Sequence, residues 1–236
     1  MNEEETFRAV LRELFGTDID MSLEEGAKVF SQGVKLPVKK KTLGGDTVYT
    51  IYDVDKYVSE KETTKMVAED TLMRPKEDIK SLKDVEKMYG ELNSFLGSKT
   101  INATNVRDSD NVLGSSHVYL SQNILSSKYI GFSENCNSCE YVYGSKFMAD
   151  SSFCIRCQDS SLTNCFEVSW SAKCSNCFYC HNCFDLQDCM FCFHLASKQY
   201  CIANRQYTKE EYEKAKKMVV EHLLKNKFRV KFFPVL

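Results

Sequence analysis

The sequence predicts a mainly β protein: a short-period parallel β-helix with a 6/12-residue repeat, capped by α-helices and preceded by a small α+β N-terminal region. The first observation is that residues 103–204 divide into seventeen units of six residues. The fourth residue of these units, from Val106 to Ile202, is apolar in every unit except the one that holds Ser160. A fixed short period is typical of solenoids, in which each unit buries its apolar face only by stacking on its neighbours.

The second observation is that alternate units differ, which indicates a coil of two units. In the odd units the fifth position holds mostly large apolar side chains, among them Tyr119, Tyr143, Ile155, Tyr179 and Phe191. In the even units the same position is mostly small or polar. We therefore expect a flattened helix of two parallel sheets with twelve residues per coil and an unbroken register, rising about 4.8 Å per coil.

The alternation of side chains along a strand predicts which positions face the core. In an odd unit the fourth and sixth residues are expected to point inward and the third and fifth outward. Serine is the first residue of nine units, and we expect these serines at the corners, bonded to the turning backbone. The outer face with Tyr119, Tyr143, Tyr179 and Phe191 is then apolar, so either the N-terminal helices and hairpin or a protein partner should cover it.

The region of residues 1–80 is predicted to dock on this repeat. Residues 3–15 place five large apolar side chains on one stripe of a helix. Ser22 and Glu25 have the spacing of a capping box and predict a second helix to Phe30. Two extended runs between Val34 and Tyr52, joined by Leu-Gly-Gly-Asp, predict a β-hairpin. The remaining residues to position 80 are expected to form a linker with one helix near 60–71.

Helices are expected at both ends of the solenoid, because an open end exposes apolar core and unpaired strand edges. Residues 81–97 are the predicted N-terminal cap, with the helix over 82–96. Residues 205–236 are predicted to form a C-terminal cap helix, started by the Thr208–Glu211 capping box, and a basic apolar tail.

All twelve cysteines lie between Cys136 and Cys201. The run from Cys174 to Cys183 repeats the CxxC spacing of zinc ribbons. Residues three apart in a strand face opposite sides, so we expect most of these pairs not to chelate a metal and favour buried thiols with a structural role. Two alternatives stay open: a zinc or iron–sulfur site in the Cys174–Cys201 cluster, and disulfides between neighbouring rungs formed by later oxidation.

Composition limits the other classes of function. The net charge of -2 gives no global reason to expect a nucleic acid partner. The acidic N-terminus and the lack of an 18-residue apolar run predict neither a secretory signal nor a membrane partner, so we expect the cytoplasm, or a virion assembled there. The four histidines, His117, His181, His194 and His222, lie at positions that favour structural roles. We assign no catalytic residue, metal ligand or cofactor.

One stretch resembles a known group of proteins. NCFYCHNCFDLQDCMFCFHLASKQYCIANRQYTKEEYEKAKK is similar to cysteine-rich parallel β-solenoid proteins of unknown function from candidate-phyla bacteria and large bacterial viruses. The likeness covers about residues 127–220, and its most specific part is the closing motif from Lys198 to Tyr212. The resemblance implies a parallel β-helix with a capping helix and no established activity, and it does not extend to residues 1–100.

The sequence therefore favours a non-enzymatic structural, assembly or interaction protein, such as a virion or particle component. An unbroken repeat leaves few loops, which are the usual place for catalytic groups. A hexapeptide-type acyltransferase fits less well, because serine stands three residues before the aliphatic position. The partner is expected to be another protein subunit, contacted through the outer face of the odd sheet or through the tail.

The tail of residues 227–236 combines apolar side chains with three cations. We expect either that it packs back on its own solenoid or hairpin, or that it adds as a strand to a neighbouring subunit. The residues expected to fill pockets there are Val230, Phe232, Phe233 and Val235. The basic stretch from Lys209 to Lys231 would then favour an acidic acceptor.

Overall fold

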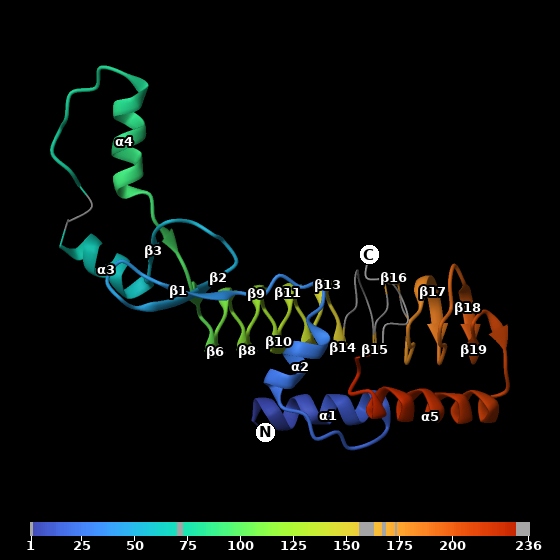
Figure 1. The fold of residues 1–236 in the computed structure, drawn as a ribbon. Coiled ribbons are helices and arrows are strands. Elements are labelled where there is room, and N and C mark those ends of the chain that lie inside the picture. Colours follow the sequence, from blue (N-terminus) through green and yellow to red (C-terminus); the bar gives the residue numbers. More distant parts are fainter. Residues whose placement is uncertain (1, 70–72, 156–162, 167–168, 173, 230–236) are drawn as a thin grey trace.

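The computed structural model describes residues 2–69, 73–155, 163–166, 169–172 and 174–229, and it confirms the predicted fold class. The chain forms a parallel β-solenoid with helices packed along one side and a small α+β region at its N-terminal end (Figure 1). Among the described residues, no helix combines the length and apolar character that crossing a membrane requires.

The solenoid is made of stacked parallel strands. One sheet holds β15 (Thr163–Phe166), β14 (Ser152–Ile155), β12 (Glu140–Tyr143), β10 (Lys128–Gly131), β8 (Ser116–Tyr119) and β6 (Thr104–Arg107). The opposite sheet holds β13 (Lys146–Ala149), β11 (Glu134–Asn137), β9 (Gln122–Leu125), β7 (Asp110–Leu113) and β5 (Thr100–Ile101). The tube continues through β16 (Ser169–Ala172), β17 (His181–Gln187) and β18 (Ala196–Gln199).

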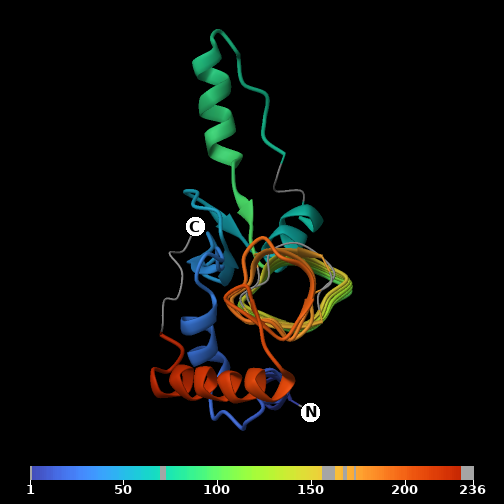
Figure 2. The same ribbon diagram turned by 90° about the vertical axis from the view of Figure 1, so that its right-hand side faces the viewer.

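The predicted coil of twelve residues is confirmed by the strand register. Ser116 pairs with Lys128, and Lys128 pairs with Glu140 in the next strand. The cross-section differs from the expected flattened helix, because every third residue from Asn102 to Asp150 has a positive φ. Each such residue turns the chain, so that a coil has four sides of three residues, and Figure 2 shows the tube nearly end-on with four corners. Asparagine and aspartate tolerate this left-handed backbone, which explains their frequency at the corners.

The left-handed corners make the predicted inward phase wrong in part. In the units up to Ser151 the first and fourth residues point into the tube, as expected for the fourth, and the sixth does not. The first-position serines therefore lie inside the tube and not at its corners, although they do bond the backbone as expected. Ser121 Oγ donates to the carbonyl of Tyr119 at 2.8 Å and accepts the amide hydrogen of Ser133, one coil further on, at 3.0 Å.

The register is not unbroken, which corrects the prediction of seventeen uniform units. Ser152 pairs with Glu140, twelve residues before it, but with Thr163, eleven residues after it. The corner positions shift by the same amount, and every third residue from Asn176 to Ala203 has a positive φ. As a result, the fourth-position residues Phe178 and Met190 face outward under the helices, and cysteines take their place inside the tube.

Three helices cover one side of the solenoid (Figure 1). They are α1 (Glu3–Phe15), α2 (Leu23–Phe30) and α5 (Lys209–Lys225). The predicted stripe of the first helix is confirmed, because α1 buries Phe7, Val10, Leu11, Leu14 and Phe15. The predicted capping boxes of α2 and α5 are present. The C-terminal helix lies along the side of the tube next to α1, and a short antiparallel pair, β19 (Cys201–Ile202) and β20 (Arg205–Gln206), follows the last coil.

The N-terminal end of the solenoid contacts the predicted hairpin, β1 (Val38–Lys41) and β2 (Thr47–Thr50). Ser98 N–H donates to the carbonyl of Tyr49 at 3.0 Å, and Tyr49 N–H donates to Ser98 Oγ at 2.8 Å. Beside the hairpin lie the parallel pair β3 (Tyr57–Val58) and β4 (Phe95–Leu96) and the helix α3 (Glu60–Ala68).

The helix predicted as the N-terminal cap does not cap the solenoid. It is α4 (Leu82–Leu92), none of its residues is buried, and it stands away from the body of the protein (Figure 1, Figure 2). The helix is also shorter than expected, because Asn93 ends it and Phe95 enters β4. We call residues 73–92 the arm.

Candidate functional site

The cysteines of the second part of the solenoid line its interior. Cys174, Cys177, Cys180 and Cys183 lie on the four sides of one coil, and each is 0–1% exposed. Cys189 and Cys192 repeat two of these positions in the next coil, and Cys201 repeats one of them again. The expectation that cysteines three residues apart face opposite sides is wrong, because a left-handed corner between them turns both side chains into the tube.

The thiols contact the carbonyl two residues back, as the serine hydroxyls do, but their second contact is to a carbonyl of the next coil and not to an amide. Cys183 Sγ lies 3.3 Å from the carbonyl oxygen of His181, two residues back, and 3.4 Å from that of Cys192, one coil further on. Cys189 and Cys192 repeat this pattern of one contact within the coil and one to the next. Cysteine therefore serves here as a small inward donor that ties successive coils together.

Cys180 is the centre of the thiol cluster. Its hydrogen bonds to the sulfurs of Cys177, Cys183 and Cys192, together with burial, raise its pKa. The hydrogen bond with Cys180 lowers the pKa of Cys183 and of Cys192.

This cluster is the predicted candidate metal site, and four sulfurs around one coil are the ligand type that zinc and iron–sulfur clusters use. Among the described residues, however, no group of three or more histidine, cysteine or acidic side chains is arranged to hold a metal ion. The nine cysteines whose side chains the structure describes are buried free thiols. The geometry favours their structural role.

The predicted interaction face of the odd sheet is largely covered by the protein itself. Tyr119, Tyr143 and Tyr179 are 8%, 2% and 2% exposed and belong to the core formed with α1, α2 and α5. Phe191 packs against the same core and stacks on Tyr179 with ring centroids 5.4 Å apart. The sequence allowed this face to be covered either by the N-terminal helices and hairpin or by a protein partner. The N-terminal helices cover it, together with α5, and the hairpin does not. These residues hold the fold together and do not form an open partner surface.

The tail residues Val230, Phe232, Phe233 and Val235 lie outside the described residues. The chain enters the tail beside a pocket of about 380 Å³ between the α1–α2 connection, α2 and the end of α5. Its apolar lining comes from Ile19, Met21, Val29, Leu224 and Phe228. Its charged lining is mixed, with the acidic residues Asp18, Asp20 and Glu25 and the basic residues Lys28, Lys227 and Arg229.

His117, His181 and His194 lie in side-chain ladders of the solenoid, and His222 lies on α5. His117 stacks on Tyr129 with ring centroids 4.5 Å apart, and its Nε2 lies 3.0 Å from Asn105 Nδ2. His194 Nδ1 lies 2.7 Å from Asn182 Nδ2, in a rung one coil away. Stacked rings turn their faces toward each other, so this ladder leaves mainly ring edges for a ligand.

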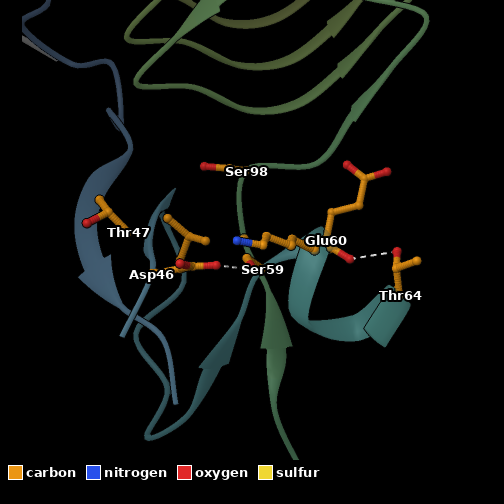
Figure 3. A pocket seen from close by; sticks show the side chains of 9 residues that line it. Asp46, Thr47, Ser59, Glu60, Thr64 and Ser98 are labelled. Carbon is orange, nitrogen blue, oxygen red and sulfur yellow. Dashed lines mark hydrogen bonds between the residues drawn. The ribbon is translucent and has the colours of Figure 1, made fainter. Parts of the chain in front are cut away.

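A second pocket lies at the hairpin turn and the start of α3 (Figure 3). It measures about 680 Å³, and Figure 3 shows the carboxylate of Asp46 directed toward Ser59, whereas the carboxylate of Glu60 points away from both. Ser59 Oγ donates to Asp46 Oδ2 at 2.9 Å, and Thr64 Oγ1 donates to the carbonyl of Glu60 at 2.8 Å. These polar groups stabilise the start of α3, which accounts for their arrangement.

The arm carries the largest gathering of exposed apolar side chains in the described residues. Leu82, Val85, Tyr89 and Leu92 of α4 are 72%, 43%, 65% and 46% exposed. Met73 and Ile79, in the segment before α4, are also exposed. The sequence predicted this helix but placed it at the solenoid end. The signal that distinguishes the two roles is the regular 3-4-3 spacing from Leu82 to Leu92, which is narrower than a typical core stripe.

Comparison of the chain with protein-family models, with curated proteins and with solved structures finds no significant match.

Proposed function

We propose that this protein is a non-enzymatic structural or assembly protein, in which the β-solenoid is a rigid frame that presents the arm to a protein partner. The supporting observation is the exposed apolar stripe of α4 on a segment that stands off the body. An apolar stripe of this kind in water usually marks a protein contact site. The frame itself is rigid because each rung is bonded to the next by backbone, serine and thiol hydrogen bonds. A role within a virion or another particle made in the cytoplasm is consistent with this proposal.

The experiment compares wild-type protein with the double variant Leu82→Glu, Tyr89→Glu. Because neither side chain is buried, the melting temperature should stay within about 2 °C of wild type, while the assembled fraction measured by light scattering should fall. Lys83→Ser changes an adjacent polar residue of α4 and is the matched control. A melting temperature lowered as by a core substitution would show instead that the stripe belongs to the protein's own fold.

The absence of catalysis is a separate part of the proposal and has its own test. Purified protein is screened for acyl-transfer and hydrolase activity with wild type, His117→Ala and His181→Ala. A robust turnover that either substitution abolishes would contradict the proposal. The twelve-residue register differs from the eighteen-residue coil that the acyltransferase alternative requires.

The tail is a second possible contact. We propose that residues 230–236 bind a neighbouring subunit, supported by their apolar sequence. Truncation after Arg229 should reduce assembly and leave the melting temperature unchanged. Loss of solubility or melting temperature with an unchanged assembly state would place the tail in its own fold.

Zinc or iron–sulfur binding is the second candidate function, favoured by the four inward cysteines of one coil. Elemental analysis of protein purified without chelator tests it. About one equivalent of bound metal, lost in Cys180→Ser, would support this candidate. A cooperatively folded, metal-free protein that is insensitive to chelator would exclude it.

A further inference from the structure

We propose that the partner of the arm is the arm of a second copy of this chain, with the two α4 helices paired antiparallel about a two-fold axis. This inference rests on the proposed function, because it names the partner for the same apolar stripe.

The shape of the stripe indicates a helical partner. Leu82, Val85, Tyr89 and Leu92 follow a 3-4-3 spacing and cover about 80° of the helix circumference at 100° per residue. A stripe limited to these positions is the seam of a coiled coil, whereas a helix that packs on a sheet or in a wide groove has a broader apolar face. A second helix of similar size therefore fits the stripe best.

The order of side-chain sizes favours an antiparallel copy. Antiparallel pairing sets Leu82 against Leu92 of the copy, and the small Val85 against the large Tyr89 of the copy. Parallel pairing would set Tyr89 against Tyr89 and Val85 against Val85, which crowds one layer and leaves a gap in the other. A two-fold symmetric contact uses the same surface on both copies, so this surface must be complementary to itself. The antiparallel arrangement also aligns the two helix dipoles favourably.

The charged side chains of α4 lie outside the apolar seam of Leu82, Val85, Tyr89 and Leu92. Lys87 lies 3.8 Å from Glu91 and 3.9 Å from Glu77, on the side away from the seam. The seam is flanked by Met88 on one side and by Glu86 on the other. In the antiparallel pair each Met88 lies near its equivalent, and each Glu86 lies near its equivalent. The two carboxylates repel each other, so Glu86→Gln should tighten the pair.

The position of the arm gives a second copy access to the seam. Figure 1 and Figure 2 show α4 beyond the hairpin and away from the solenoid, so two arms can meet while the two bodies lie at opposite ends. Lys56 Nζ donates to the carbonyl of Gly90 at 2.6 Å and holds the end of α4 on the β3–β4 base.

The length of the helix sets the strength of the contact. An isolated helix of this length is marginal in water, so pairing and helix formation are coupled, and we expect a reversible dimer with a dissociation constant in the micromolar range, on the order of 10 μM. A Cβ added at Gly90 meets open space. Gly90→Ala should favour the helix and tighten the dimer about fivefold.

The test is sedimentation velocity of the full chain over a concentration series. Wild type should form a reversible dimer, Leu82→Glu with Tyr89→Glu should weaken it by tenfold or more, and Lys83→Ser should leave it unchanged. Glu86→Gln and Gly90→Ala should strengthen it. Wild type that stays monomeric, or a dimer that the double glutamate variant leaves intact, overturns the proposal.

Cysteine cross-linking tests the direction of pairing. A mixture of Leu82→Cys and Leu92→Cys should form the mixed disulfide under mild oxidation with diamide, faster than either variant forms a disulfide with itself. The nine wild-type thiols whose side chains the structure describes are buried, and wild-type protein under the same oxidation gives the background. Preferential cross-linking of Leu82→Cys with itself would show a parallel pair and overturn the antiparallel proposal. A third outcome separates this inference from the proposed function. If purified wild type is monomeric, but assemblies isolated from cells contain wild type and lack the double glutamate variant, the arm binds a different protein. The second copy is then excluded, and the proposed function remains.

Discussion

The two parts of the solenoid, residues 103–155 and residues 174–204, share one backbone geometry and differ in what fills it. The described interior of the first part is filled by valine, isoleucine, methionine and serine, together with Cys136 and Cys139. The second part is filled mainly by cysteine, with Leu186 and Leu195. Both parts turn at left-handed corners every third residue, and both bond each coil to the next. The backbone repeat therefore tolerates two different cores, provided that each inward residue is compact and has its polar atom bonded to a carbonyl.

The largest expected difference concerns side-chain volume. Ile124→Ala in the first part should cost about 2–5 kcal/mol, because it removes a fully buried aliphatic side chain and leaves a cavity. Cys192→Ala in the second part removes one sulfur atom and should cost about 1 kcal/mol. Chemical denaturation under reducing conditions measures both. Equal costs would mean that the two parts do not differ in how they are stabilised.

A smaller effect is expected for the polar contacts inside the tube. Ser121→Ala removes the acceptor of the Ser133 N–H at 3.0 Å and leaves that amide buried and unbonded, which should cost about 1–3 kcal/mol. The matched change in the second part is Cys180→Ser, where the carbonyls of Phe178 and Cys189 can accept the new hydroxyl. It should cost less than about 1 kcal/mol. A larger cost for Cys180→Ser than for Ser121→Ala would favour a metal-binding role for the thiols.

Much of this fold could be predicted from the sequence, because the strongest signals are local and periodic. The parallel solenoid, the twelve-residue coil, the helix of residues 3–15 and the Thr208 capping box all rest on spacing within short segments. The inward phase was wrong because strand alternation assumes extended backbone at every residue. Asn111 and Asn123 at regular intervals of twelve were the available sign of left-handed corners.

Two features could not be read from the six-residue pattern. The first is the register shift between Cys154 and Cys165. After the shift the inward residue is Cys177, and Phe178 at the fourth position of the unit faces outward. Because both residues are apolar, the fourth position stays apolar and the six-residue pattern does not show the shift. The placement of α4 depends on the hairpin, which already contacts the solenoid end through Tyr49 and Ser98. A stripe pattern predicts that a helix face will be covered, but it does not name the partner.

The smallest expected effect is a loss of folding stability at high pH, which tests how tightly the helices pack on each part of the solenoid. Tyr143 of the first part packs against Phe7 of α1, and Tyr212 of α5 packs on the second part, where its hydroxyl donates to the carbonyl of Asn176 at 3.5 Å. Burial raises the pKa of Tyr143 and of Tyr212 above the usual value for tyrosine.

The sign of the pH effect follows from which state binds the proton. Above the unfolded-state pKa of about 10, the unfolded chain loses the tyrosine proton while the folded chain keeps it, so stability falls as pH rises. Each tyrosine should contribute a loss of about 1.4 kcal/mol per pH unit between pH 10 and its folded pKa. Tyr143→Phe and Tyr212→Phe should each remove one such contribution, so the stability difference from wild type should shift in favour of the variant between pH 8 and pH 11. Measuring this difference cancels the thiol titrations, which all three proteins share. A shift for Tyr143→Phe without one for Tyr212→Phe would show that α5 lets its tyrosine ionise in the folded state, and that the second part is held less tightly than the first.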